Sequence, residues 1–381
     1  MGSEQIRPVR QLQDTQEADR RFMQLALTLG RRGLGRTWPN PAVGAVVVKD
    51  GIIVGRGWTQ AGGRPHAEPE ALRRAGRQAR GATLYVTLEP CSHVGKSPPC
   101  TEAVIASGIA RVVAAIEDPN PEVADQGFAR LRAAGIAVDI GLEAAEAART
   151  HAGHFRRIHD RRPHVILKLA VSADDKIGAA GSKQVAITGE VAHRRVHLLR
   201  AQCDAVLVGI GTVVADDPRL TCRLPGMEAR SPVRVVLDRA LRIPDDSRLI
   251  HSASQTPLWV VTSQLAREAV ATRLAAAGAQ VIPVSATTTS DLQLPAVLRM
   301  LAKRGITRLM VEGGSRVASS FVAADFVDEA WLLRGPEAIG EDGVSALDGL
   351  QLTTITQSRA FGIRSSESLG QDTLTIYERR P

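Results

Sequence analysis

Short runs of Val, Ile and Leu recur along this chain, and segments with apolar residues at helical spacing separate most of them. In the first part of the chain, runs typical of β-strands cover Ala42–Val48, Ile52–Trp58, Ala82–Leu88, Ala110–Ile116 and Ala137–Ile140. Spacing typical of helices is found at Glu17–Leu29, at Glu68–Arg80, from Cys100 onwards and at Asp125–Ala134. This alternation predicts an α/β protein built in layers.

The alternation stops at Thr150–Pro163, a polar segment rich in His and Arg, and then resumes. The later predicted strands are His164–Val171, Asp204–Gly209, Val233–Leu237, Leu258–Thr262, Gln280–Val284, Arg308–Val311, Glu329–Leu333 and Thr373–Glu378. The later predicted helices are Glu190–Ala201, Leu265–Ala277, Leu294–Arg304 and Arg316–Ala324. A length of 381 residues predicts two domains. We expect a flexible arm at 1–16, a domain at 17–150, a linker at 151–163 and a domain at 164–381.

Composition excludes several classes of protein. The chain has 48 Lys and Arg against 40 Asp and Glu, and the net charge of +8 is spread along the sequence. No stretch reaches the ~20 apolar residues of a membrane helix, and the polar N-terminus lacks the apolar region of a signal peptide. Four cysteines make no disulfide framework, and 3% aromatic residues argue against stacking platforms for single-stranded nucleic acid. We therefore expect a cytoplasmic protein that binds neither a membrane nor nucleic acid.

One histidine and two cysteines in the first half of the chain form a ligand set that suits zinc. His66 stands just before a predicted helix, and Cys91 and Cys100 enclose the segment SHVGKSPP. Three protein ligands leave the fourth tetrahedral position open, which is typical of catalytic zinc. Zinc lowers the pKa of a bound water towards ~7, and a carboxylate is then needed to move protons. Glu68, two residues from His66, is placed for that role.

The spacing of these residues departs from one known pattern. Zinc base deaminases carry H-x-E followed by P-C-x-x-C, whereas Cys100 lies nine positions after Cys91. A purely structural zinc is the alternative, and His93 is the one candidate for a fourth ligand that is close in sequence.

Four segments of the first half carry a resemblance to a known family. They are WPNPAVG at 38–44, PHAE at 65–68, TLEPCSHVGKSPPC at 87–100 and EDPNP at 117–121. Together they resemble the bifunctional deaminase/reductases of riboflavin biosynthesis, in which the long loop between the cysteines is the usual form. The resemblance implies a cytidine-deaminase-like three-layer domain in which His66, Cys91 and Cys100 hold zinc and Glu68 shuttles protons. It also implies substrate contacts from Asn40, His93 and Lys96.

The second half resembles the reductase part of the same family. The matching segments are 164–177, 198–223, 233–239 and 311–315, in the family's order. The resemblance implies a dihydrofolate-reductase-like fold that uses NADPH. The implied cofactor contacts are Ala170, Thr212, Asp216, Gly314, Ser315, Arg316, Val317, Ala318, Ser319 and Ser320. The implied substrate contacts are Lys168, Arg200, Leu220, Arg223 and Glu312, of which Lys168 and Glu312 are the candidates for orienting or protonating the substrate.

This half also departs from the family at two positions. Asp175 stands where the family usually has Gly, so a positive φ there would place strain on Asp175. Ala186 stands where the family usually has Trp, so an aromatic side chain that could pack on the cofactor is missing.

The resemblance implies two consecutive reactions. The first is hydrolytic deamination of 2,5-diamino-6-(5-phosphoribosylamino)pyrimidin-4-one, and the second is reduction of the deaminated product to its ribityl form by NADPH. The expected partners are this phosphoribosylated pyrimidine and further copies of the chain in a homo-oligomer. Two alternatives stay open. One is a nucleic-acid base editor, and the other is a deaminase whose second half serves only binding or dimerisation.

Overall fold

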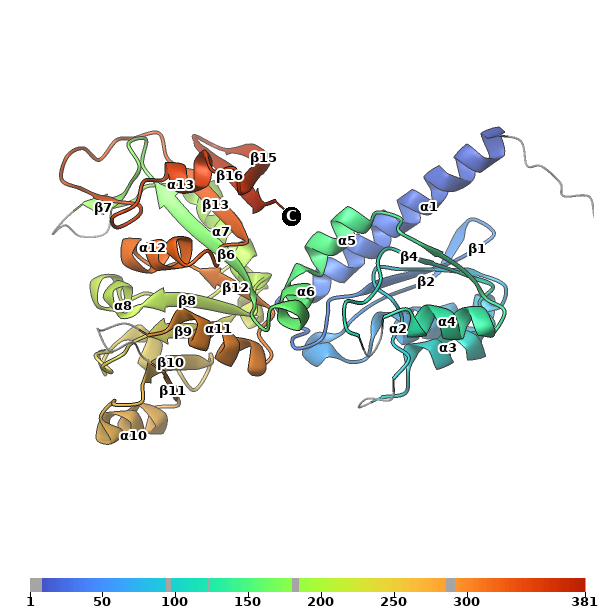
Figure 1. The fold of residues 1–381 in the computed structure, drawn as a ribbon, viewed down its shortest axis with the longest axis horizontal. Helices are drawn as coiled ribbons and strands as arrows, with labels where there is room; N and C mark the ends of the chain where they lie inside the picture. The colour runs from blue at the N-terminus through green and yellow to red at the C-terminus, as the bar shows by residue number, and fades with distance from the viewer. Residues whose placement is uncertain (1–8, 94–96, 122–123, 180–184, 286–291, 381) are drawn as a thin grey trace, which may run out of the picture. The chain divides into compact units, whose positions relative to one another are not determined.

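The computed structural model describes residues 9–93, 97–121, 124–179, 185–285 and 292–380. The chain divides into two compact units, Met1–Asp160 and Arg161–Pro381, and each contains its own large sheet (Figure 1). The division falls inside the segment 151–163 that the sequence predicts to be a linker. Most of that segment is helical, because α6 spans Ala152–His159 and packs as part of the first unit.

The first unit contains six α-helices and five strands among its described residues. The helices are α1 (Val9–Gly30), α2 (Ala67–Ala75), α3 (Cys100–Ser107), α4 (Gln126–Ala133), α5 (Ala144–Thr150) and α6 (Ala152–His159). The strands are β1 (Gly44–Lys49), β2 (Ile52–Trp58), β3 (Thr83–Val86), β4 (Arg111–Ala114) and β5 (Ala137–Ile140). The predicted strands are all present, and α1 begins eight residues before the predicted start at Glu17. Residues 9–16 contain no Gly or Pro, so nothing in their sequence ends the helix.

The sheet of the first unit has the order β2-β1-β3-β4-β5. The β1–β2 and β1–β3 pairs are antiparallel, whereas β3, β4 and β5 run parallel. Successive residues of β1 point to opposite faces: Ala45 and Val47 pack with α2, and Val46 and Val48 pack with α1. Helices therefore cover both faces, which confirms the predicted three-layer domain.

The second unit contains eleven strands and seven α-helices among its described residues. The strands are β6 (His164–Val171), β7 (Lys176–Ala179), β8 (Ala205–Gly209), β9 (Val233–Leu237), β10 (Leu258–Ser263), β11 (Gln280–Val284), β12 (Arg308–Val311), β13 (Glu329–Arg334), β14 (Gly343–Ser345), β15 (Phe361–Leu369) and β16 (Asp372–Arg379). The helices are α7 (Glu190–Ala201), α8 (Ile210–Asp216), α9 (Arg248–His251), α10 (Glu268–Ala276), α11 (Leu294–Lys303), α12 (Ser315–Ala323) and α13 (Thr353–Thr356).

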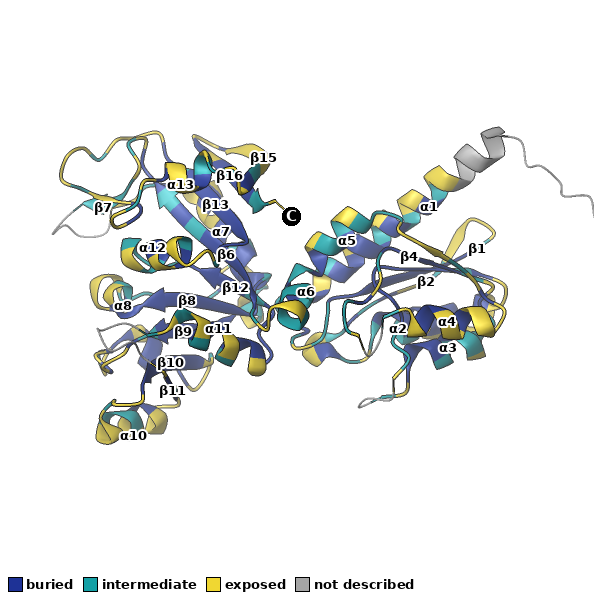
Figure 2. Cartoon of the chain, in the orientation of Figure 1, coloured by how far each residue is buried: buried dark blue, intermediate teal, exposed yellow. Residues whose placement is uncertain are grey.

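Nine of these strands form one sheet in the order β11-β10-β9-β8-β12-β6-β13-β16-β15. The strands from β11 to β13 run parallel, and β16 and β15 are antiparallel additions at one edge. Strands β8 and β10 are buried at every position, and Figure 2 shows the centre of the sheet in the colour of buried residues. The carboxyl ends of parallel strands meet at one edge, where ligands of α/β sheets bind.

Candidate functional site

The three predicted zinc ligands of the first unit lie together. His66 is the residue before α2, Cys100 is the first residue of α3, and Cys91 lies in the loop after β3. One donor atom from each side chain lies within 4.8 Å of the other two. The His66 Nδ1 atom is 3.3 Å from the Cys100 sulfur and 3.7 Å from the Cys91 sulfur. The structure thus brings together groups that are 34 residues apart in the sequence.

Asn40 orients the imidazole of His66. Its Nδ2 atom lies 3.2 Å from His66 Nε2 and donates to the Gly63 carbonyl at 2.9 Å. Gly63 has a φ of 83°, and a Cβ atom there would lie 2.8 Å from Asn40 Cγ. Only glycine accepts both the positive φ and this close approach. Asn40 therefore fixes the ring so that Nδ1 faces the two sulfurs.

The two thiols share one hydrogen-bonding arrangement. The Cys100 backbone N–H donates to the Cys91 sulfur at 3.4 Å, and the Thr101 N–H donates to the Cys91 carbonyl at 3.2 Å. The Cys100 thiol and His66 also bond to the Cys91 sulfur and lower the pKa of Cys91, whereas bonding to Cys91 and burial raise the pKa of Cys100. The Cys91 sulfur, which accepts the N–H at the start of α3, is therefore the one that favours the thiolate form.

Glu68 is placed beside the three donors without being one of them. It is the second residue of α2 and only 3% exposed, and its carboxylate is hydrogen-bonded to the Cys100 side chain. Burial raises the pKa of Glu68 to about 7, against the opposing charge of His66. A carboxyl group with a pKa near neutrality can both accept and release a proton at physiological pH.

The donor set fits zinc. One imidazole nitrogen and two thiol sulfurs are ligands that Zn²⁺ prefers, and three of them leave a fourth position for water or substrate. His93 is exposed and is not a member of the donor cluster found in the described part of the chain, so it does not complete a structural zinc site there. Lys96 lies outside the described residues.

A cavity of about 630 Å³ lies beside the donor cluster. His66 and Cys100 form part of its wall, as do Arg64 and Ser97, where Arg64 donates a hydrogen bond to Ser97. The remaining wall is formed by Pro65, Pro69, Pro98, Pro99, Glu102, Ala103 and Ala106. A small molecule can therefore reach the donors.

Three charged side chains meet at the second site, in the Arg161–Pro381 unit. Glu312 is the residue after β12, and its Oε1 atom lies 3.3 Å from Lys168 Nζ. Its Oε2 atom accepts from Arg200 Nη2 at 2.8 Å and from Arg200 Nε at 2.9 Å. Burial alone would raise the pKa of Glu312, but the two cations outweigh it and hold that pKa at about 2. Glu312 is therefore ionised at neutral pH.

Lys168 and Ala170 share the less buried face of β6, because every second residue of a strand points the same way. Helices α8 and α12 are joined at their starts by the Gly314 N–H, which donates to Thr212 Oγ1 at 3.2 Å. Glycines at 313 and 314 precede α12, and the missing side chain at Gly313 leaves room for Val317, whose Cβ would lie 2.8 Å from a Cβ atom there. These features fit a phosphate-bearing cofactor such as NADPH.

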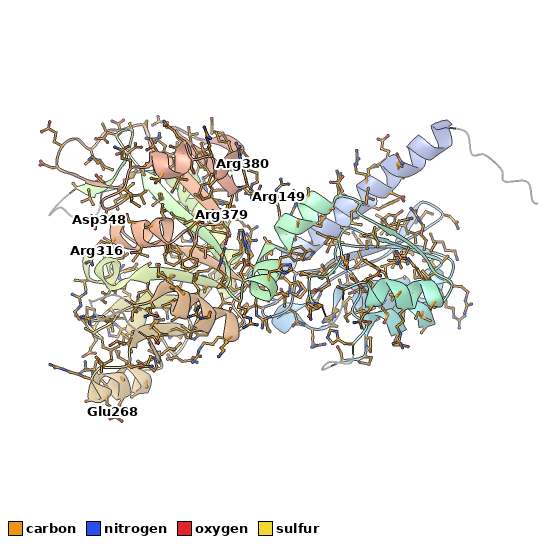
Figure 3. The ribbon with its side chains drawn as sticks, viewed as in Figure 1. Arg149, Glu268, Arg316, Asp348, Arg379 and Arg380 are labelled. Atoms are coloured by element: carbon orange, nitrogen blue, oxygen red, sulfur yellow. The ribbon has the colours of Figure 1, made fainter. Side chains whose placement is uncertain are left out.

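The other predicted cofactor contacts are more dispersed. Ala318 and Ser319 are buried within α12, whereas Arg316 and Ser320 are exposed on it. The Arg316 side chain is labelled in Figure 3. Asp216, the last residue of α8, is also exposed. Gly314, Ser315, Arg316 and Val317 therefore lie at the N-cap and first turn of α12, beside the glycine turn, and the rest of the run to Ser320 lies farther along the helix.

Two family models together match most of the chain. A model described as the cytidine and deoxycytidylate deaminase zinc-binding region matches residues 16–116, and the RibD C-terminal domain matches residues 163–375. The riboflavin biosynthesis protein RibD of Aquifex aeolicus is 40% identical over 95% of this chain and 99% of its own length. The chain belongs to the RibD family. Its first unit is accordingly a zinc-binding deaminase domain, and its second is a reductase domain of the NADPH-dependent RibD type.

Further relatives cover more than nine-tenths of this chain. RibD of Escherichia coli K12 is 39% identical over 93% of this chain and 97% of its own. The structure of Acinetobacter baumannii RibD matches with a TM-score of 0.84 and 34% identity, over 96% of this chain and all of that one. The structure of a diaminohydroxyphosphoribosylaminopyrimidine deaminase/5-amino-6-(5-phosphoribosylamino)uracil reductase from Thermotoga maritima matches with a TM-score of 0.83 and 34% identity, with the same coverage.

The two departures from RibD sequences have different outcomes. Asp175 adopts a φ of 62°, as its replacement of glycine predicts, and its carboxylate accepts from Arg334 Nη2 at 2.5 Å. Its short polar side chain tolerates this conformation better than most side chains would. Ala186 is exposed, and the neighbouring residues 180–184 lie outside the described part of the chain.

A histidine that the sequence did not single out, His197, lies beside the predicted substrate residues Arg200 and Arg223. His197 lies three residues before Arg200 on α7, and its Nδ1 atom accepts from the Arg223 N–H at 3.3 Å. Arg200 Nη1 donates to the Thr221 carbonyl at 3.1 Å, so α7 holds this segment at two points. Leu220, just before it, is 3% exposed and has a φ of 54°. His197 could have been found from the sequence, because residues three apart on a predicted helix lie on the same face and Arg200 was already a predicted substrate contact.

No helix among the described ranges is long and apolar enough to cross a membrane.

Proposed function

We propose that this chain carries out two consecutive reactions on one phosphoribosylated pyrimidine. The first removes the 2-amino group of 2,5-diamino-6-(5-phosphoribosylamino)pyrimidin-4-one by hydrolysis, and the second reduces 5-amino-6-(5-phosphoribosylamino)uracil to its ribityl form with NADPH. The full-length match to the Thermotoga maritima deaminase/reductase supports this assignment. The single observation that carries it is the cluster of His66, Cys91 and Cys100 with buried Glu68 beside it.

In the deaminase step, His66, Cys91 and Cys100 would hold the zinc ion. When bound, zinc supplies a Lewis acid that makes water nucleophilic at neutral pH. Glu68 accepts one proton from the attacking water and transfers it to the ring nitrogen; it then takes the remaining hydroxyl proton and delivers it to the amine, which departs as ammonia while the ring carbonyl forms. Its pKa of about 7 suits both directions of transfer. Asn40 keeps His66 in the orientation that the ligand set requires. We further propose that His93 and Lys96 contact the pyrimidine and the ribose phosphate.

In the reductase step, NADPH supplies the hydride. We propose that the cofactor lies along Ala170, Thr212 and the start of α12, with Asp216 and the rest of 314–320 at the margin of its site. Lys168 would donate a proton to the opened sugar, because Glu312 keeps its ammonium group close to the strand edge. Arg200 is already engaged by Glu312 and Thr221, so it orients that carboxylate, and Leu220 and Arg223 would complete the substrate site.

A product analysis tests both steps. Purified protein with bound zinc is incubated with the diamino-pyrimidine phosphate, with and without NADPH, and the products are identified by mass spectrometry. We expect the deaminated product without NADPH and the ribityl product with it. Glu68→Gln should keep zinc, lose deamination and still reduce the deaminated compound. Substantial deamination by this variant would remove Glu68 from its role. If NADPH is present and is not consumed while the deaminated product accumulates, the second unit is no reductase.

We also propose that the enzyme works in the cytoplasm, acts on the free pyrimidine rather than on nucleic acid, and forms a homo-oligomer. Reduced thiols are required at the metal site, and Cys91 and Cys100 are both free cysteines. Strand β15 forms an exposed edge of the large sheet, with Ile363 65% exposed, which supports contact with a second copy. Light scattering tests the oligomer, and a steeply salt-dependent affinity for tRNA or single-stranded DNA would contradict the choice of substrate.

A further inference from the structure

The side chain of Glu89 gathers four backbone N–H groups next to the metal site. Glu89 lies two residues before Cys91 and is only 4% exposed. Its Oε1 atom accepts from Gly127 N at 2.8 Å and from Phe128 N at 3.3 Å. Its Oε2 atom accepts from Asp125 N at 3.1 Å and from Asp118 N at 3.3 Å. Each carboxylate oxygen thus accepts two backbone N–H groups, and the four hydrogen bonds together fix the position of this side chain.

These donors come from two separate parts of the chain. Asp118 belongs to the loop after β4, and its own carboxylate accepts from the Asn120 N–H at 2.9 Å. The other three donors belong to the N-cap and first turn of α4, whose N–H groups have no partner within the helix. Asp125, the N-cap, has a φ of 58°, a conformation that costs free energy and needs support from its surroundings. Glu89 supplies that support.

Helix α4 also contacts the backbone of the ligand loop directly. A Cβ atom at Gly127 would lie 2.2 Å from the Pro90 carbonyl oxygen, so the absence of a side chain at Gly127 allows this contact. Pro90 therefore lies against the first turn of α4, and Cys91 follows it. On its other side, Cys91 is held by α3, through the Thr101 N–H to its carbonyl at 3.2 Å and the Cys100 N–H to its sulfur at 3.4 Å.

We propose that Glu89 is a positioning residue of the zinc site, which holds Cys91 at the correct place between α3 and α4 through its four backbone hydrogen bonds. The inference rests on the proposed zinc deaminase activity of the first unit. The side chain of Glu89 bonds to these four backbone N–H groups, so its effect on the ligands acts through the backbone of Pro90 and Cys91. Groups that orient metal ligands in this way typically contribute roughly 10- to 100-fold in metal affinity or activity.

The test is Glu89→Gln, which keeps the shape of the side chain but presents an NH₂ group to two of the four N–H donors. The matched control is Glu117→Gln, since Glu117 is a carboxylate on the same loop as Asp118 that takes no part in the Glu89 hydrogen bonds. The affinity of the full-length apo-proteins for Zn²⁺ is measured by competition with a chromophoric chelator. We expect a loss of at least about tenfold for the Glu89 variant and no change for the control. Deaminase kcat should fall with KM unchanged, and reductase activity, which belongs to the other unit, should stay unchanged.

Two further measurements separate positioning from general folding. Thermal unfolding shows whether the Glu89→Gln protein is folded, and Glu89→Asp, which keeps the charge on a shorter side chain, serves if it is not. Co²⁺-loaded protein reports the cysteine geometry through its thiolate charge-transfer bands, which should shift in the folded variant. A folded variant with the zinc affinity and cobalt spectrum of the parent protein would overturn the proposal. Because metal affinity needs no substrate, this result stays distinct from a failure of the proposed deamination.

Discussion

Removal of the charge of Glu312 gives the most quantitative prediction for the reductase unit. Its carboxylate is 14% exposed and is paired with Lys168 and Arg200, which are 16% and 10% exposed. The pair of cations holds the pKa of Glu312 at about 2, against an ordinary value of 4.5. At ~1.4 kcal/mol per pKa unit, this shift corresponds to about 3 kcal/mol of stability at neutral pH. Glu312→Gln leaves the two cations facing each other, so it should lower the free energy of unfolding by about that amount.

The pH dependence of this loss has a definite sign. The pKa of Glu312 is lower in the folded protein, so its contribution is complete above 4.5 and is lost as the pH falls towards 2. The difference between parent and variant should stay constant from about pH 7 to pH 5 and shrink by ~1.4 kcal/mol for each pH unit below about 4.5. An exposed acid gives the control, and Glu337→Gln should change stability by less than ~0.5 kcal/mol.

The assay is hydrogen exchange of the full chain in urea, with mass spectrometry of peptides from β6 and β12. These strands pair with each other in parallel and belong to the second unit, so the readout is independent of unfolding in the first. A Glu312→Gln protein as stable as its parent at pH 7 would refute the reasoning, as would a difference that does not shrink on acidification.

Three further predictions concern other parts of the chain. In urea unfolding, Gly81→Ala should destabilise the first unit by ~1 kcal/mol, and Gly63→Ala should destabilise it by more. Both glycines have a positive φ, but of the two only Gly63 has neighbours within 4 Å of the position that a Cβ would take. Equal losses of stability would contradict the clash with Asn40. Burial lowers the pKa of His151 to about 3. Below about pH 6.5, His151 therefore binds a proton in the unfolded chain but not in the folded one. Acidification to pH 5 should lower the free energy of unfolding of the parent protein by ~2 kcal/mol more than that of His151→Gln. Equal pH dependence of unfolding in the two proteins would count against this. Burial raises the pKa of Cys203 to about 12. In chelator-treated native protein, a thiol reagent should therefore label Cys91 and leave Cys203 unlabelled until the protein unfolds. Mass mapping that finds Cys203 labelled before Cys91 would refute this prediction.

The sequence identifies the donors of the zinc site more completely than their supports. The positions of His66, Cys91 and Cys100 follow from motifs in which residue type and order are enough. The role of Glu89 does not, because its hydrogen-bonding partners are backbone groups 29 to 39 residues away, which have no signature in sequence. The family resemblance implies that Asn40 contacts substrate, and only the fold shows that its amide lies against His66.

The same limit applies to the second unit. The apolar runs predict the central strands because those strands are buried on both faces. The sequence of β15, FGIRSSESL, is mostly polar and exposed, so only its pairing with β16 at the sheet edge identifies it. The contact between Arg200 and Glu312 joins residues 112 apart, and the left-handed conformation of Leu220 is imposed by packing that periodicity does not reveal. Asp175 is the exception, because its replacement of a family glycine predicts the positive φ that is observed.

Diffraction from crystals of the zinc-loaded protein, recorded on both sides of the zinc absorption edge, tests the central claim most directly. We expect one anomalous peak per chain, about 2.3 Å from the sulfurs of Cys91 and Cys100 and about 2.0 Å from His66 Nδ1, with Glu68 outside the ligand sphere. A peak held by a different set of side chains, or no peak at this cluster in protein that contains one equivalent of zinc, would contradict the account.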